Sequence, residues 1–220
     1  MSAHLQRAID KLMEELIGLS AKVEESLKKA MQSLEERDVE LARQVIEEDE
    51  AIDQKEIDIE EECLKIFALH QPVAIDLRYL VAVLKINNDL ERIGDLAQNI
   101  SKHAIRIVSH PVVIKPVDLQ EIYDEVRLMV KQSLDAIVNM DIDAAGGVMN
   151  KDNEVDRLNR ELYHKILDQI KENTSEAEIL LQYIHIIRHL ERIADHATNI
   201  AEDVIYLISG QIVRHGNTDD

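Results

Sequence analysis

The stretch that decides the fold occurs twice. Residues 89–101 read DLERIGDLAQNIS, and residues 189–201 read HLERIADHATNIA. A repeat at a spacing of about one hundred residues is far longer than the roughly 20–50-residue unit of a solenoid, so it indicates a duplicated domain. At this constant shift the identical pairs are Leu90/Leu190, Glu91/Glu191, Arg92/Arg192, Ile93/Ile193, Asp95/Asp195, Ala97/Ala197, Asn99/Asn199 and Ile100/Ile200.

Each copy is predicted to be a helix with one apolar and one acidic face. In the first copy, apolar residues recur every three or four positions, from Ile86 to Ile107. Glu91 and Asp95 lie one turn apart on the other face, and Glu191 and Asp195 repeat this in the second copy. Like charges at this spacing repel by a few tenths of a kcal/mol unless a cation lies between them. For a single pair, a solvated surface would be the ordinary interpretation.

A second acidic pair is also duplicated, at a shift of 103. Asp49 and Asp53 in the first half correspond to Asp152 and Asp156 in the second. The first of these pairs falls between two apolar lines on its predicted helix, which suggests a packing seam. Carboxylates in a seam need a cation or hydrogen bonds to offset their desolvation. The lines are Val45, Ile52, Ile59, Cys63 and Ile66, and Ile46, Ile57 and Leu64.

The hydrophobic periodicity predicts an all-α protein of two tandem antiparallel three-helix bundles. The connector HPVVIKP, at 110–116, holds two of the three prolines, and we place the domain boundary there. The first bundle is predicted over 1–110, the second over 116–212, and a disordered tail over 213–220. The expected helices cover about 3–36, 38–68, 73–109, 118–139, 141–172 and 175–209.

The composition excludes several classes of partner. The 220-residue chain has 44 acids against 25 bases, a net charge of −19. Such a charge repels nucleic acids and anionic lipid surfaces, and it disfavours direct phosphate binding unless a metal bridges. No apolar run reaches the roughly 18 residues that a membrane span needs, and the N-terminus lacks a secretory pattern. We therefore expect a cytoplasmic protein without membrane insertion, in which Cys63 is a core residue.

The acidic pairs favour metal binding over catalysis. Carboxylate-only pairs suit Mg, Mn or Ca, or iron where carboxylates are many. Di-iron bundle enzymes add a Glu-x-x-His motif, which neither half has at these positions. His185 and His189 share a helical face, as zinc ligands can, but the first half has Lys85 and Asp89 there. They are therefore interpreted first as surface histidines, with zinc ligation as the alternative.

The duplicated motifs give the chain a resemblance to the PhoU family, the accessory and regulatory proteins of bacterial phosphate-specific transport. The similarity spans nearly the whole chain and rests on LERIGDLAQNI, LERIADHATNI and an E(D)xxxD motif twice in each half. The resemblance implies two three-helix bundles with iron, zinc or other divalent ions, singly or in small clusters, at the motifs. By position, the metal-binding role falls on Asp49, Asp53, Glu91, Asp95, Asp152, Asp156, Glu191 and Asp195.

The same resemblance implies a function without enzyme activity. Members of the family are negative regulators of phosphate uptake and of phosphate-starvation signalling. They act by contact with the ATPase of the phosphate ABC transporter and with a membrane sensor histidine kinase. Whether the protein forms a homodimer, and whether the two acidic sites are equivalent, is left open at this stage.

Two other hypotheses remain beside this one. The first is a metal-free helical adaptor whose acidic faces are solvated. The second is a carboxylate-metal enzyme such as a phosphatase or an oxidase, against which the missing histidines argue.

Overall fold

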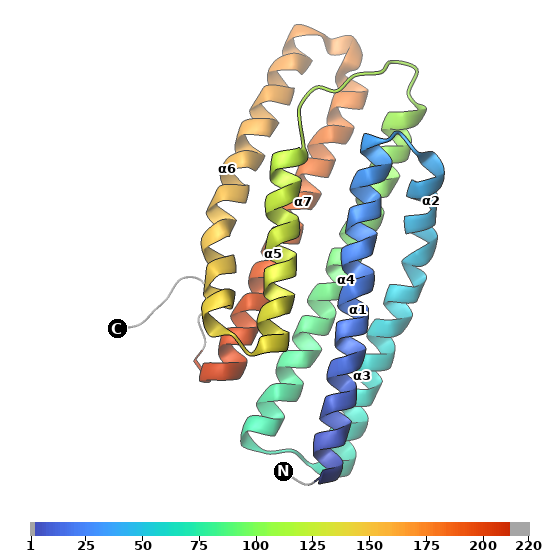
Figure 1. Ribbon diagram of the computed structural model, residues 1–220. Helices are drawn as coiled ribbons and strands as arrows, with labels where there is room; N and C mark the ends of the chain where they lie inside the picture. The colour runs from blue at the N-terminus through green and yellow to red at the C-terminus, as the bar shows by residue number, and fades with distance from the viewer. Residues whose placement is uncertain (1–2, 212–220) are drawn as a thin grey trace.

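The computed structural model describes residues 3–211, and all regular structure in that range is helical. Figure 1 shows two sets of helices side by side, α1 to α4 in one and α5 to α7 in the other. Because α2 and α3 follow each other directly and together take the place of one helix, this confirms the predicted all-α fold of two three-helix bundles. The predicted tail at 213–220 lies outside the described residues. The elements are α1 (Ala3–Glu35), α2 (Val39–Glu48), α3 (Glu50–His70), α4 (Ala74–Ser109), α5 (Gln120–Asn139), α6 (Ile142–Glu172), the 3₁₀ turn η1 (Thr174–Glu176) and α7 (Ala177–Ser209).

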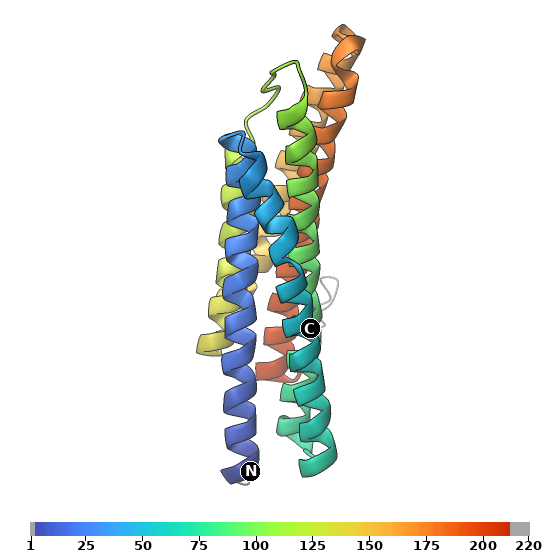
Figure 2. The same ribbon diagram turned by 90° about the vertical axis from the view of Figure 1, so that its right-hand side faces the viewer.

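The helix predicted over 38–68 is not continuous, and this part of the prediction is wrong. It is divided at Asp49 into α2 and α3, and Figure 2 shows the change of direction between them. Asp49 keeps helical dihedral angles, φ −61° and ψ −38°, and its carbonyl accepts from the backbone N–H groups of Ile52 and Asp53. The chain therefore bends without unwinding, and α2 packs against both α1 and α4.

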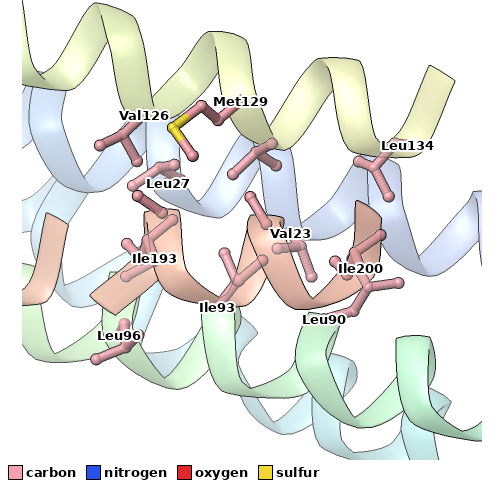
Figure 3. Packing of buried hydrophobic residues seen from close by; sticks show 14 of the residues in the cluster. Val23, Leu27, Leu90, Ile93, Leu96, Val126, Met129, Leu134, Ile193 and Ile200 are labelled. Atoms are coloured by element: carbon pink, nitrogen blue, oxygen red, sulfur yellow. The ribbon is translucent and has the colours of Figure 1, made fainter. Parts of the chain in front are cut away.

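Aliphatic side chains of four helices build a core that the two bundles share. Figure 3 shows Val23 and Leu27 of α1, Leu90 of α4, Val126 of α5 and Ile193 of α7 in the space between these helices, as parts of one cluster. All five side chains are buried. Because the chain has only 3% aromatic residues, this core consists mainly of branched aliphatic side chains that suit close helix packing. Cys63 is also fully buried, as predicted, and burial raises the pKa of its thiol to about 12.

The most extensive helix contact joins α4 to α7, the two helices that carry the duplicated stretch. They run antiparallel through the middle of the molecule (Figure 1). Within residues 3–211, no helix combines the length and the apolar character that crossing a membrane requires.

Candidate metal centre

The bend between α2 and α3 brings three of the predicted acidic residues together. Asp49 lies at the bend, Asp53 in the first turn of α3, and Asp95 in the middle of α4. Each offers a carboxylate oxygen, and these three oxygens all lie within 4.8 Å of one another. Within the part of the chain that the structure describes, this is the one group of three acidic, histidine or cysteine ligands so closely spaced.

Asp49 is the buried member of this group, which we call the first acidic centre. Its exposed fraction is 3%, and its Oδ1 has no hydrogen-bond partner among the described residues. Desolvation, followed by the charges of Asp53 and Asp95, raises the pKa of Asp49 to about 6, although the charge of Lys102 opposes the shift. A buried carboxylate without a partner costs free energy that a bound cation would offset.

Gly94 explains how α4 can pass so close to the bend. A Cβ atom at Gly94 would lie 3.1 Å from Cγ2 of Ile52 and 3.5 Å from Oδ1 of Asp49. Its equivalent in the second half is Ala194, so the sequence predicts a small side chain here, for which close approach of another helix is one explanation. The structure confirms that prediction for Gly94 and shows that the contact is made at the acidic centre itself.

Glu91, the fourth predicted residue of the first half, is not part of the convergent group. Its Oε2 is buried without a hydrogen-bond partner among the described residues and lies 3.4 Å from Nε of Arg92. Desolvation, then the charge of Asp95, raises the pKa of Glu91. Arg92 also donates to Oδ2 of Asp95 at 3.2 Å. Glu91 therefore lies beside the centre, and the half-exposed Arg92 competes with a cation for Oδ2 of Asp95.

In the second half the four predicted acidic residues lie near one another, but their carboxylate oxygens are not grouped as closely as those of Asp49, Asp53 and Asp95. The pKa of Glu191 is raised by desolvation and then by Asp195, and that of Asp195 by desolvation and then by Asp152. The pKa of Asp152 is raised in the same way, by desolvation and then by Asp156. Asp156 already has a partner, since Arg160 lies 3.5 Å away. The two halves thus differ, with the first better prepared for a cation.

The sequence reasoning missed Lys102 as a member of the first centre's surroundings. Its charge is the one that lowers the pKa of Asp49, and its Nζ donates to Gln98 and, at 3.5 Å, to Asn99. Lys102 follows Asp95 by seven residues, two turns along the same helical face. This seven-residue spacing from Asp95 is the feature of the sequence that could have predicted Lys102 near the centre.

The residues at the first centre fit a divalent cation. Three converging carboxylates are hard oxygen donors, and the buried, partnerless Oδ1 of Asp49 is free to act as a ligand to a cation. Asp49, Asp53 and Asp95 would hold the ion, which would bridge the bend and α4. Fold and site together define a class of protein: a duplicated helical-bundle protein with carboxylate-rich candidate metal sites.

Comparisons with known proteins agree with this class. The model of the PhoU domain family matches residues 16–104 and 119–204. A phosphate-specific transport system accessory protein PhoU homologue of Pseudomonas putida is 38% identical over 216 residues, covering 98% of this chain and 84% of the relative. PhoU homologue 1 of Thermotoga maritima is 34% identical over 209 residues, covering 94% and 90%.

Solved structures give the same result. The crystal structure of PhoU from Pseudomonas aeruginosa matches with a TM-score of 0.91 at 36% identity, covering 94% of this chain and 99% of that one. The phosphate transport system regulatory protein PhoU from Streptococcus pneumoniae matches with a TM-score of 0.88 at 29% identity, covering 95% and 99%. The chain belongs to the PhoU family.

Proposed function

We propose that this protein is an accessory protein of a phosphate-specific transport system and restrains phosphate uptake and starvation signalling. It acts in the cytoplasm, by protein contact and without enzyme activity, on the transporter ATPase and a membrane sensor histidine kinase. Its relatives are accessory proteins of phosphate-specific transport systems, which supports the link to phosphate transport. A divalent metal ion, iron or zinc first, bound at the acidic motifs, is part of the proposal.

The observation that carries the metal part is the convergence of Asp49, Asp53 and Asp95 around a buried oxygen without a partner. Without a cation, three carboxylates within 4.8 Å repel one another in a partly desolvated place. A divalent ion held by Asp49, Asp53 and Asp95 would replace this repulsion with attraction and would tie the bend at Asp49 to α4. Metal loading would thereby fix the direction of α3, and with it the surface that a partner meets.

Exposed apolar side chains support the part of the proposal that concerns protein contact. Leu69, Val73 and Ile75 lie at the turn from α3 to α4 and are 77%, 72% and 68% exposed. This turn forms one end of the molecule (Figure 1). Apolar side chains gathered at an exposed end are typical of protein interaction sites. Since α3 leads directly from the acidic centre to this turn, metal loading and partner contact would be mechanically linked.

The alternative function is a metal-free helical adaptor. Lys102 and Arg92 favour it, because their charges partly neutralise the first acidic centre without any metal. Elemental analysis of the protein purified without chelator separates the two. We expect bound metal and, after stripping, a rise in melting temperature of about 5–10 °C on adding back Fe²⁺, Mn²⁺ or Zn²⁺ at a hundred times its Kd. No bound metal and no rise would favour the adaptor.

The partners need a separate experiment in cells. In a pull-down from phosphate-replete cells, we expect a transporter ATPase and a sensor kinase to co-purify with the tagged protein. Smaller amounts of both should co-purify from phosphate-starved cells. The double variant Leu69→Ser, Ile75→Ser should retain less of either partner, and exposed Lys171→Ser on α6 is the matched surface control. Recovery of neither protein under either condition would contradict the proposed contacts.

A further inference from the structure

Three histidines, none of them part of an E(D)xxxD motif, meet on the α4–α7 contact. His103 comes from α4, and His185 and His189 come from successive turns of α7. The ring centres of His103 and His185 are 4.9 Å apart, and those of His103 and His189 are 5.3 Å apart. The tertiary structure therefore adds a third imidazole to the two that share a face in the sequence.

The protonation of the His103 ring is fixed by Gln182. Nδ1 of His103 lies 2.8 Å from Oε1 of Gln182. The amide orientation of Gln182 is set by two other contacts: its Nε2 donates to the carbonyl of Glu178 at 3.3 Å, and Arg106 donates to its Oε1 at 3.5 Å. An oxygen can only accept, so Nδ1 of His103 must be the donor. Its Nε2 then keeps the lone pair that a metal ion needs.

His189 supplies a ring nitrogen without a hydrogen-bond partner among the described residues, and His185 makes the cluster accessible to solvent. Nδ1 of His189 is buried and has no hydrogen-bond partner among the described residues. His185, one turn earlier on α7, is exposed to solvent. A neutral imidazole held by a second hydrogen bond from its far nitrogen is the usual arrangement of a metal-bound histidine, and Gln182 provides it for His103.

We propose that His103, His185 and His189 form a separate, nitrogen-donor site for a divalent transition metal ion of the zinc class. Bonds of about 2.0–2.1 Å from zinc to nitrogen put the centres of two tetrahedrally bound imidazole rings roughly 5 Å apart, close to the spacing found here. The His103 and His185 rings are stacked at an angle of 12°, so their nitrogens do not converge on one point in this structure. Binding one ion requires the exposed His185 ring to turn about its side-chain torsions, while Gln182 holds His103. Three imidazoles and no carboxylate select zinc-class ions over Mg²⁺ and Ca²⁺.

The charges around the cluster set its affinity. Desolvation lowers the pKa of His103, although its hydrogen bond with Gln182 opposes the shift, and a lowered pKa favours the neutral ring that binds metal. Arg106 on α4 and Arg188 and Arg192 on α7 face the cluster and weaken the binding of any cation there. A bound ion would keep a fourth position for water, as in three-histidine zinc sites.

The test uses the full chain with Zn²⁺ and, as a spectroscopic probe, Co²⁺. Co²⁺ bound tetrahedrally by nitrogen absorbs strongly in the visible range, whereas Co²⁺ at an octahedral oxygen site absorbs weakly. We expect the strong bands in the unaltered protein and in the variant Asp49→Asn, Asp95→Asn. His185→Gln should weaken Zn²⁺ binding at least tenfold and abolish the bands, since His185 is exposed and its loss does not disturb the core.

Two further variants make the result specific. His164→Gln, an exposed histidine on α6, should bind Zn²⁺ as the unaltered protein does. Gln182→Leu should weaken binding several-fold and, in the metal-free protein, shift the nitrogen NMR signals of His103 towards the other tautomer. Unchanged Zn²⁺ binding in His185→Gln would overturn the proposal. So would loss of the strong bands in the Asp49→Asn, Asp95→Asn variant, which would assign the ion to the acidic centre.

Discussion

Nζ of Lys85 lies 2.6 Å from Oδ1 of Asp203, across the contact between α4 and α7. Through the shift of one hundred residues, these two positions correspond to His185 and His103, which stack at the same helix contact. The antiparallel pair therefore has approximate two-fold symmetry, with an ion pair in one place and histidines in the equivalent one. The duplication preserved the backbone contact, while its polar side chains diverged.

The ion pair predicts a stability effect at this contact. The Asp203 side chain is only 10% exposed, so Lys85→Met removes one charged partner of a largely desolvated carboxylate. We expect the free energy of unfolding to fall by about 1–3 kcal/mol at pH 7, measured by urea denaturation. The matched control is Lys171→Met, which breaks an ion pair with Asp168 whose side chains are both more than 60% exposed; it should change stability by under about 1 kcal/mol. Equal effects of both variants would contradict the prediction.

The raised pKa of Asp49, about 6, predicts a pH-dependent stability in chelated protein. Between about pH 4 and 6 the folded state holds more protons than the unfolded state at this group, so its contribution to stability decreases as the pH rises and is constant above pH 6. Asp49→Asn removes this penalty. It should stabilise the protein at pH 7.5 by up to about 3 kcal/mol, the equivalent of a two-unit pKa difference, and by little near pH 4.

Denaturation curves of both proteins at pH 4.5, 6 and 7.5 test this. Asp58→Asn, at an exposed acid on the same helix α3, serves as the control. A stability gain for Asp49→Asn that is the same at all three pH values would show that the carboxylate charge is not its cause.

The contact between Gly94 and Ile52 predicts a compensating pair of substitutions. A Cβ at Gly94 would meet Cγ2 and Cδ1 of Ile52 at 3.1 and 3.3 Å, and Ile52 is buried. Gly94→Ala should therefore cost about 1 kcal/mol, since overpacking outweighs the gain in helix propensity. The second half has the smaller Val155 where the first has Ile52, and Ala194 where it has Gly94. Ile52→Val should accordingly cost less in the Gly94→Ala background than alone.

A double-mutant cycle measures that coupling. The control is Ile59→Val, at a buried isoleucine two helical turns after Ile52 on α3. Its effect on the free energy of unfolding should add to that of Gly94→Ala without coupling. Strict additivity for Ile52→Val as well would mean that α4 shifts as a whole to accept the methyl group.

The unequal acidic sites predict different responses to metal. Asp95→Asn removes one of the three converging ligands, and should abolish most of the metal-dependent rise in melting temperature. In metal-free protein the same variant should be slightly more stable, by a few tenths of a kcal/mol, because repulsion is relieved. Asp195→Asn, the equivalent change in the second half, should leave most of the metal response intact. An identical loss in both variants would contradict the inequality of the two halves.

The fold was predictable from local patterns. Helical periodicity from Ile86 to Ile107 and its repeat depend on side-chain spacing along one helix, which the sequence carries directly. The bend at Asp49 was not predictable, because Asp49 keeps helical dihedral angles and no glycine or proline marks it. Likewise, the interpretation of His185 and His189 as separate surface histidines missed their contact with His103.

The sequence by itself determined the helical class, the duplication and the eight candidate acidic ligands, since each of these is a matter of composition or of spacing within one helix. Only the tertiary structure decided which of them meet. Convergence depends on where helices cross, and here the crossing is set by the absent side chain of Gly94 and the direction of α3 after the bend. That geometry brings Asp49, Asp53 and Asp95 together and leaves their counterparts in the second half as neighbours without the same close convergence.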